Sequence, residues 1–227
     1  FQRIALWAVL SGIFWIAGGV ASPEQRLFWW GAALLIDLAG PWMQFGMPGL
    51  GRSSTADWDV DGGHMAERCG LFVIIALGES LLVTGATFAG LEWTPGNWLG
   101  FLSALVGSIA MWWIYFDTGA EAGHHRIAHS KDPGRIARKA YTYIHVLIVG
   151  GVIVSAVADE LALVHPDEAS FAGISALLGG PILYLLGNAL FKWVSSDRAA
   201  PPLSHLLGIL IILALIPMAY GRLYSPL

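Results

Sequence analysis

One carboxylate stands in the middle of a long apolar segment. The segment 64–89 begins with a charged cluster and continues as an apolar run that contains Glu79. At about 1.5 Å per residue, Glu79 lies roughly 15 Å beyond Cys69, close to the midplane of a bilayer whose boundary falls at that cysteine. A charged side chain at this depth costs about 2.5–3.5 kcal/mol on insertion scales, so Glu79 must be paired, protonated or hydrated.

Three further polar residues share this segment. At about 100° per residue, His64, Arg68 and Glu79 lie within about 60° of one another on a helix, and Glu67 lies on the flank of that face. A polar stripe from the cytoplasmic mouth to mid-membrane predicts a proton or ion path, with Glu79 as the titrating or coordinating group. The alternative is a structural staple, in which Ser, Tyr or Trp donors of neighbouring helices bind the carboxylate.

A second carboxylate, Asp37, lies about ten residues into the apolar segment 27–45 and so also near mid-depth. Pro41 follows one turn later and frees a backbone carbonyl. A carboxylate beside a free carbonyl predicts a site for a cation or a proton. The alternative is a hydrogen bond to the carboxylate from the indole N–H of a tryptophan such as Trp30 or Trp42.

Aromatic and titratable residues gather where two apolar segments meet the cytoplasmic face. Tyr115 and Asp117 end one segment, and Tyr141 and His145 begin the next, one helical turn apart. Together with Arg68 they predict a cytoplasmic vestibule. The alternative for the aromatic residues is a belt at the membrane interface.

The connection between these two segments carries a weak metal-site pattern. Glu121, His125 and His129 recur every four residues, so on a helix they would share one face and could bind zinc, with His124 beside them. The alternative is a solvated connector near anionic lipid. No phosphate-binding glycine loop or cysteine-rich metal motif is present, so we expect no cofactor and no nucleic-acid binding.

The composition predicts a membrane protein. The chain of 227 residues is 56% hydrophobic and 12% charged, whereas soluble domains carry about 25% charged residues. Apolar runs of about 20 residues recur, and irregular backbone cannot face lipid, so we predict an all-α, polytopic helix bundle with lipid as its surroundings. A single transmembrane domain, 1–227, would contain about seven spans, roughly 4–20, 27–45, 64–89, 98–116, 140–157, 171–191 and 203–220. The polar stretches 46–63 and 117–135 are predicted loops.

The basic residues predict the orientation of these spans. With a cytoplasmic N-terminus, ten of the twelve Lys and Arg residues fall inside, and only Arg26 and Arg222 fall outside. The connection that contains Asp159, Asp167 and Glu168 has no Lys or Arg, as suits an outside loop.

Three motifs in order resemble one family. They are HMAERCGLFVIIALGES at 64–80, WWIYFD at 112–117 and AYTYIH at 140–145. The chain thereby resembles the bacterial low temperature requirement protein A family, polytopic membrane proteins named for a growth phenotype and without a settled activity. The resemblance implies a multi-pass protein of the bacterial inner membrane. Typical members begin with further helices and a Glu-Leu-Phe-Phe-Asp-Leu type motif that is absent here, so we expect the C-terminal part of a member.

Two functions fit these observations. The leading hypothesis is proton- or ion-coupled transport or permeation along the third span, with Glu79 at its centre and Asp37 as a partner. The alternative is a non-catalytic accessory subunit that docks onto other membrane-protein subunits. A membrane enzyme acting on lipid at the interface near Tyr115, Asp117 and His145 is a weaker third hypothesis, and we expect no enzymatic activity.

Overall fold

The computed structural model describes residues 1–55, 60–117, 119–166, 170–195 and 199–224, and of 119–122 and 222–224 only the backbone. These residues are almost entirely helical, and the only β-pairing among them is an isolated bridge between Met47 and Gly51. The predicted all-α fold is therefore confirmed. Asp167, Glu168 and Arg198, used above for the orientation, lie outside the described residues.

Seven long helices correspond to the seven predicted spans. They are α1 (Gln2–Val20), α2 (Pro23–Trp42), α3 (Gly62–Ala89), α4 (Pro95–Phe116), α7 (His145–Val164), α8 (Phe171–Val194) and α9 (Leu203–Tyr224). Within the described ranges, six helical segments are long and apolar enough to cross a membrane. The exception is α2, because its polar first turns and Asp37 lower its mean hydropathy.

The helix boundaries follow local capping chemistry. The side chains of Asp61, Thr94 and Ser170 each accept a hydrogen bond from the backbone N–H three residues later, at the starts of α3, α4 and α8. Such caps satisfy backbone N–H groups that have no partner within the first turn of a helix. Pro95, which directly follows Thr94, suits the first helical position because it lacks an N–H.

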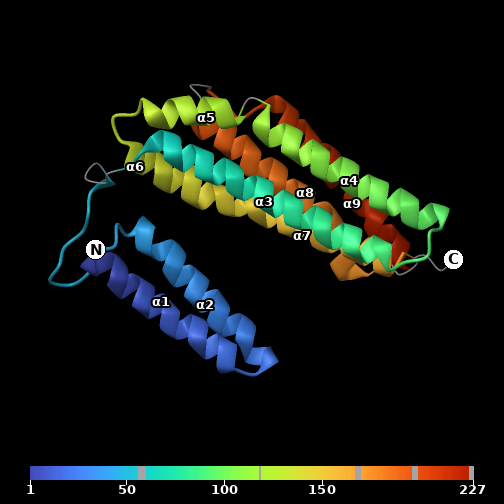
Figure 1. Ribbon diagram of the computed structural model, residues 1–227, viewed down its shortest axis with the longest axis horizontal. Coiled ribbons are helices and arrows are strands. Elements are labelled where there is room, and N and C mark those ends of the chain that lie inside the picture. Colours follow the sequence, from blue (N-terminus) through green and yellow to red (C-terminus); the bar gives the residue numbers. More distant parts are fainter. Residues whose placement is uncertain (56–59, 118, 167–169, 196–198, 225–227) are drawn as a thin grey trace. The chain divides into compact units, whose positions relative to one another are not determined.

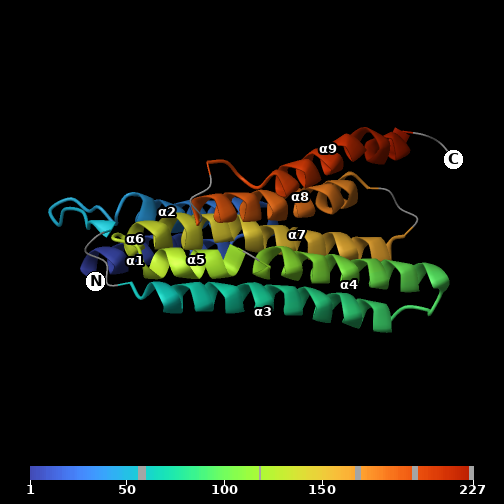
Figure 2. The ribbon, with the colours of Figure 1, turned by 90° about the horizontal axis from the view of Figure 1, so that it is seen from above.

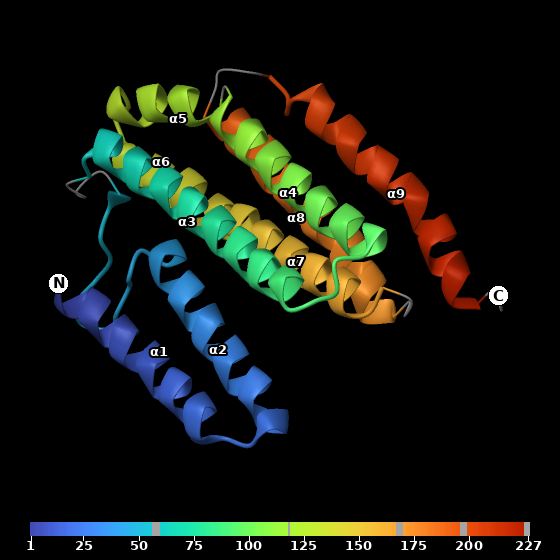
Figure 3. The same ribbon diagram turned by 45° about the vertical axis from the view of Figure 1, so that its right-hand side comes forward.

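The chain divides into two compact units, residues 1–60 with 131–138, and residues 61–130 with 139–227. In the first unit, α1 and α2 form an antiparallel hairpin (Figure 3). The short helix α6 (Pro133–Ile136) also belongs to this unit, where Thr55 donates a hydrogen bond to Asp132 at 3.0 Å and Arg138 donates to the carbonyl of Pro41 at 3.3 Å. That both units form one transmembrane domain stays a prediction.

The second unit is a bundle around α7 and α8, which α3 and α4 flank (Figure 1). Glycines let α7 and α8 approach closely: a Cβ added at Gly151 would lie 2.5 Å from the backbone nitrogen of Tyr184. Small residues at such contacts are typical of membrane helix packing. Helix α9 packs on α8 and diverges from it toward the C-terminal end (Figure 2).

The stretch 117–135, predicted as a loop, contains helical structure. Helix α5 (Gly119–Ala128) is polar on its outside and buries Ile127 completely, against the start of α3 at Gly62. The following span also begins earlier than predicted. A π-helix, η2 (Ala137–Ile144), leads into α7, so the apolar helical segment runs over Pro133–Val164.

Candidate functional site

Glu79 lies on the outer face of α3. The face that packs into the second unit presents buried side chains of Val73, Leu77, Ser80, Thr84 and Phe88. Glu79 is exposed on the opposite side, among large apolar side chains that are each more than half exposed, namely Phe72, Ile75 and Leu82. Because these neighbours are apolar, the face as a whole is suited to lipid or to another membrane helix.

Glu79 has no partner among the residues that the structure describes: it takes part in no hydrogen bond and no ion pair there. His64, Glu67 and Arg68 are likewise exposed near the start of α3. The four residues thus leave a polar stripe on an otherwise apolar surface. No described residue of the second unit provides Glu79 with the donor that a staple requires.

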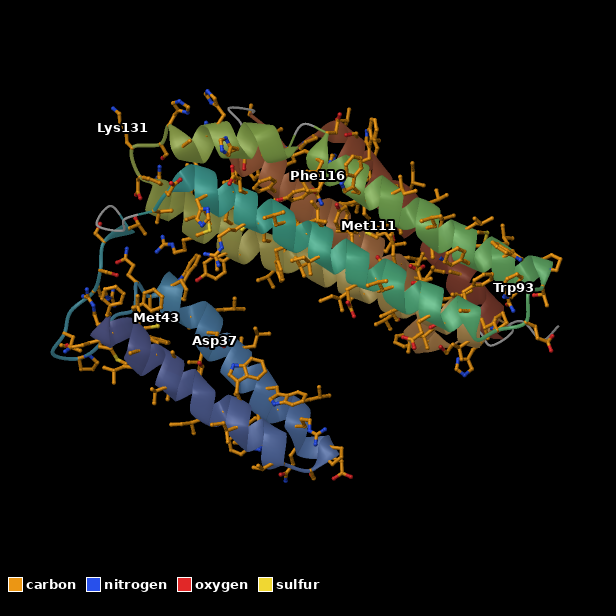
Figure 4. All side chains as sticks on the ribbon, in the orientation of Figure 1. Asp37, Met43, Trp93, Met111, Phe116 and Lys131 are labelled. Carbon is orange, nitrogen blue, oxygen red and sulfur yellow. The ribbon has the colours of Figure 1, made fainter. Side chains whose placement is uncertain are left out.

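Asp37 contrasts with Glu79 because it has a partner. The indole N–H of Trp15 on α1 donates a hydrogen bond to the Asp37 carboxylate at 2.9 Å, and the indole of Trp30 donates to the carbonyl of Trp15 at 3.3 Å. Asp37 itself is exposed, on the second half of α2 (Figure 4). The partner is thus a tryptophan, but it comes from α1 and is neither Trp30 nor Trp42.

Three of the four proposed vestibule residues meet in the core of the second unit. The Tyr115 hydroxyl lies 2.8 Å from Nε2 of His145, and the ring of Tyr141 stacks on His145 with centroids 5.3 Å apart. The rings of all three also pack against Phe191. Tyr115, Tyr141 and His145 are only 1%, 5% and 4% exposed, so in this conformation they are closed to solvent.

The backbone fixes the proton on the His145 ring. Nδ1 lies 2.8 Å from the carbonyl of Ala140, which can only accept, so Nδ1 carries a hydrogen. In the neutral ring Nε2 is then the acceptor, and the Tyr115 hydroxyl donates to it. Ala140 stands five residues before His145, within η2. π-Helical turns are rare and frequently occur at functional sites.

Both ring nitrogens of His145 are therefore occupied, and no carboxylate side chain contacts the ring among the described residues. Such a fully bonded group ties α7 to α4 and has no free lone pair with which to bind a ligand. Asp117, the fourth vestibule residue, is exposed at the end of α4, and Arg68 is exposed on α3, so neither shares this burial.

The sequence is similar to that of one known protein family. The family model described as "Bacterial low temperature requirement A protein (LtrA)" matches residues 1–225. The chain belongs to the bacterial low temperature requirement A (LtrA) family. A curated relative, an uncharacterized protein of Rhizobium meliloti (strain 1021), is 40% identical over 216 residues, which cover 94% of this chain and 52% of that protein. The chain thus spans about half the length of this relative. No solved structure matches this chain.

Of the three residues predicted as a zinc site in this LtrA chain, the structure describes the side chains of His125 and His129. The rings of His125 on α5 and of His129, directly after α5, stack with centroids 4.3 Å apart, and Nδ1 of His129 donates to the carbonyl of His125 at 2.9 Å. The side chain of Glu121 lies outside the described residues. Within the described part of the chain, no group of three or more His, Cys, Asp or Glu is placed to hold a metal ion.

Sequence reasoning missed the polar residues that α8 contributes to the core of this LtrA protein. The Tyr184 hydroxyl donates to the carbonyl of Met111 on α4 (Figure 4 labels Met111), and the side-chain amide of Asn188 donates to the carbonyl of Tyr184 at 3.0 Å. Lys192 is also buried. Their spacing of four residues, which places them on one helical face, is the signal that could have found them.

Proposed function

We propose that this LtrA-family protein carries protons, or ions coupled to protons, across the bacterial inner membrane along the outer face of α3. The observation that carries the proposal is the position of Glu79, exposed among apolar side chains near mid-helix and without a partner among the described residues. Ionisable residues at membrane depth are rare and mark ion pathways and proton relays.

The chemistry follows from the two states of a carboxyl group. A protonated Glu79 is neutral and therefore tolerable on an apolar face, whereas an ionised Glu79 requires water or a cation beside it. His64, Glu67 and Arg68 would collect and release protons or ions at the cytoplasmic end of the stripe. Asp37, on α2 of the first unit, is the second carboxylate that we propose to take part, and it accepts a hydrogen bond from Trp15.

Proton flux into liposomes tests this proposal. The purified protein is reconstituted, a pH gradient and a potassium diffusion potential are imposed, and internal pH is followed with a trapped dye. We expect the wild type to conduct, Glu79→Gln to be inactive, and Glu92→Gln to conduct as the wild type does. Glu92 is the matched control because it is exposed in the turn between α3 and α4. Equal flux through Glu79→Gln and wild type would refute the path.

The same face also favours a second candidate, an accessory subunit of a larger membrane complex. Phe72, Ile75 and Leu82 form an apolar surface that no described helix of the second unit covers. A transmembrane helix of another protein with a hydrogen-bond donor at mid-depth would cover it and satisfy Glu79. A photo-reactive amino acid at Ile75, activated in intact membranes, should then cross-link to protein. Cross-links to lipid alone would exclude this candidate.

A further inference from the structure

Helix α5 closes one end of the core of the second unit by direct contact. A Cβ added at Gly123 would lie 2.7 Å from both the Tyr141 hydroxyl and the ring of Phe191, and one added at Gly62 would lie 2.7 Å from the backbone of Ile127. Figure 1 shows α5 beside the first turns of α3. Only glycine at position 123 permits this close approach, because any side chain would collide with Tyr141 or Phe191.

A polar group without a partner among the described residues lies beneath this cover. The Tyr141 hydroxyl is buried and makes no hydrogen bond among the described residues. Elsewhere in the second unit, the side-chain oxygen atoms of Asn188 on α8 and of Ser195 directly after α8 are buried and have no hydrogen-bond partner among the described residues. Buried polar groups are nearly always hydrogen-bonded, and an unpaired one generally points to water or another ligand. The closed state therefore leaves hydrogen-bonding capacity unused at this end of the core.

The composition of α5 suits a segment that can leave the bundle. His124 and His125 are exposed on α5, and His129 is exposed just after its end. Among the described side chains of α5, which belong to residues 124–128, only Ile127 is fully buried. Lifting α5 would thus expose little apolar surface from these described side chains. Segments with few buried apolar contacts open at lower free energy than the core does.

We propose that α5 is a lid over a hydration site, and that water reaches the Tyr141 hydroxyl and the neighbouring Tyr115–His145 pair when the lid lifts. The open state would be the cytoplasmic vestibule, which is closed in the present conformation. This inference goes beyond the proposed function, because it concerns the core of the second unit and not the outer face of α3. Its test does not involve flux, so the two can fail separately.

Hydroxyl-radical footprinting of the reconstituted protein measures the access of water to individual side chains. Oxidation of Tyr141 and of Tyr184 is followed by mass spectrometry; Tyr184 is equally buried but lies against α4 and α7, so it serves as the internal control. Gly123→Leu forces α5 away from Tyr141. We expect oxidation of Tyr141 to rise about fivefold or more, while Tyr184 stays protected. Gly107→Leu, where nothing lies within 4 Å of an added Cβ, should change neither.

Ile127→Ala provides a second variant that loosens α5 without adding volume, in case Gly123→Leu does not fold. We expect the same selective rise at Tyr141. The lid is refuted if Tyr141 stays as protected as Tyr184 in both variants while circular dichroism shows an intact bundle. A parallel rise at both tyrosines would also refute it, because α5 would then open only together with the whole unit.

Discussion

The outer face of α3 differs from two contacts in the core of the second unit, Tyr115 with His145 and Tyr184 with Met111, because only the core contacts are hydrogen-bonded among the described residues. In the core, Tyr115 pairs with His145, and Tyr184 pairs with the carbonyl of Met111. On the outer face, Glu79 has no partner among the described residues. A hydrogen-bonded core group contributes to stability, whereas an unpaired carboxylate near mid-membrane contributes nothing to packing and is costly to keep. We therefore expect the hydrogen-bonded core groups to contribute to stability, and Glu79 to contribute to the proposed proton or ion path.

Depth in the bundle explains why the two regions differ. Tyr115, Tyr184 and His145 lie between helices, so the loss of one of their hydrogen-bond partners would cost the full desolvation of the group. Glu79 points away from its own bundle, so its environment depends on what lies outside the second unit. Substitutions in the core should therefore reduce stability, and substitutions on the outer face should change activity alone.

The largest loss of stability is expected from Gly151→Leu. Its Cβ would lie 2.5 Å from the backbone nitrogen of Tyr184. A helix backbone cannot move aside as a flexible side chain can, so we expect failure to fold or a loss of more than about 3 kcal/mol in unfolding free energy. Thermal unfolding in detergent measures the effect. Gly107→Leu faces open space on α4 and should unfold like the wild type. If both variants were equally stable, α7 and α8 would not be in close contact.

A smaller loss is expected from Tyr115→Phe. The substitution leaves Nε2 of His145 buried without its donor, at a cost of about 1–3 kcal/mol in unfolding free energy. His145→Phe should cost a similar amount, and the double variant should cost less than the sum of the two. Strictly additive losses in this double-mutant cycle would show that the two side chains are not coupled.

A loss of about 1 kcal/mol or less is expected from Trp15→Phe, which removes the hydrogen bond to Asp37. The carboxylate is exposed, so the loss of its donor leaves no buried unpaired group. Thermal unfolding in detergent, followed by circular dichroism, measures this change. If Trp15→Phe lost as much stability as Tyr115→Phe, the hydrogen bond of Asp37 would contribute like those of the core, and exposed and buried polar groups would not differ as proposed.

The smallest effect on stability is expected from Glu79→Gln. The side chain touches no hydrogen-bonding partner among the described residues, so the unfolding midpoint should match that of the wild type or exceed it. A marked drop in the midpoint would reveal a staple and contradict the assignment of the outer face to activity.

Much of this arrangement could be predicted from the sequence. The apolar periods marked all seven long helices, and the distance of Glu79 from the end of its segment placed it near mid-helix. The structure brings Tyr115, Tyr141 and His145 together, and their role in a vestibule stays a prediction. These inferences depend on segment length and helical spacing, which are local properties.

The remaining features depend on contacts between distant segments. The partner of Asp37 is Trp15, which lies 22 residues earlier on another helix, and no spacing rule distinguishes it from Trp30 or Trp42. The lid-like helix α5 was predicted as a loop because its polar composition carries no membrane signal. The π-helix η2 was also not predicted, because an apolar pattern predicts a helix but not the i→i+5 hydrogen bonds that define a π-helix.

Proton flux through Glu79→Gln and Tyr115→Phe, measured side by side in the same liposomes and at a temperature where both are folded, tests the central contrast most directly. The account predicts that Glu79→Gln loses flux while keeping its stability, and that Tyr115→Phe retains flux while losing stability. Full flux in Glu79→Gln together with loss of flux in Tyr115→Phe would contradict it, since the path would then run through the core and not along the outer face of α3.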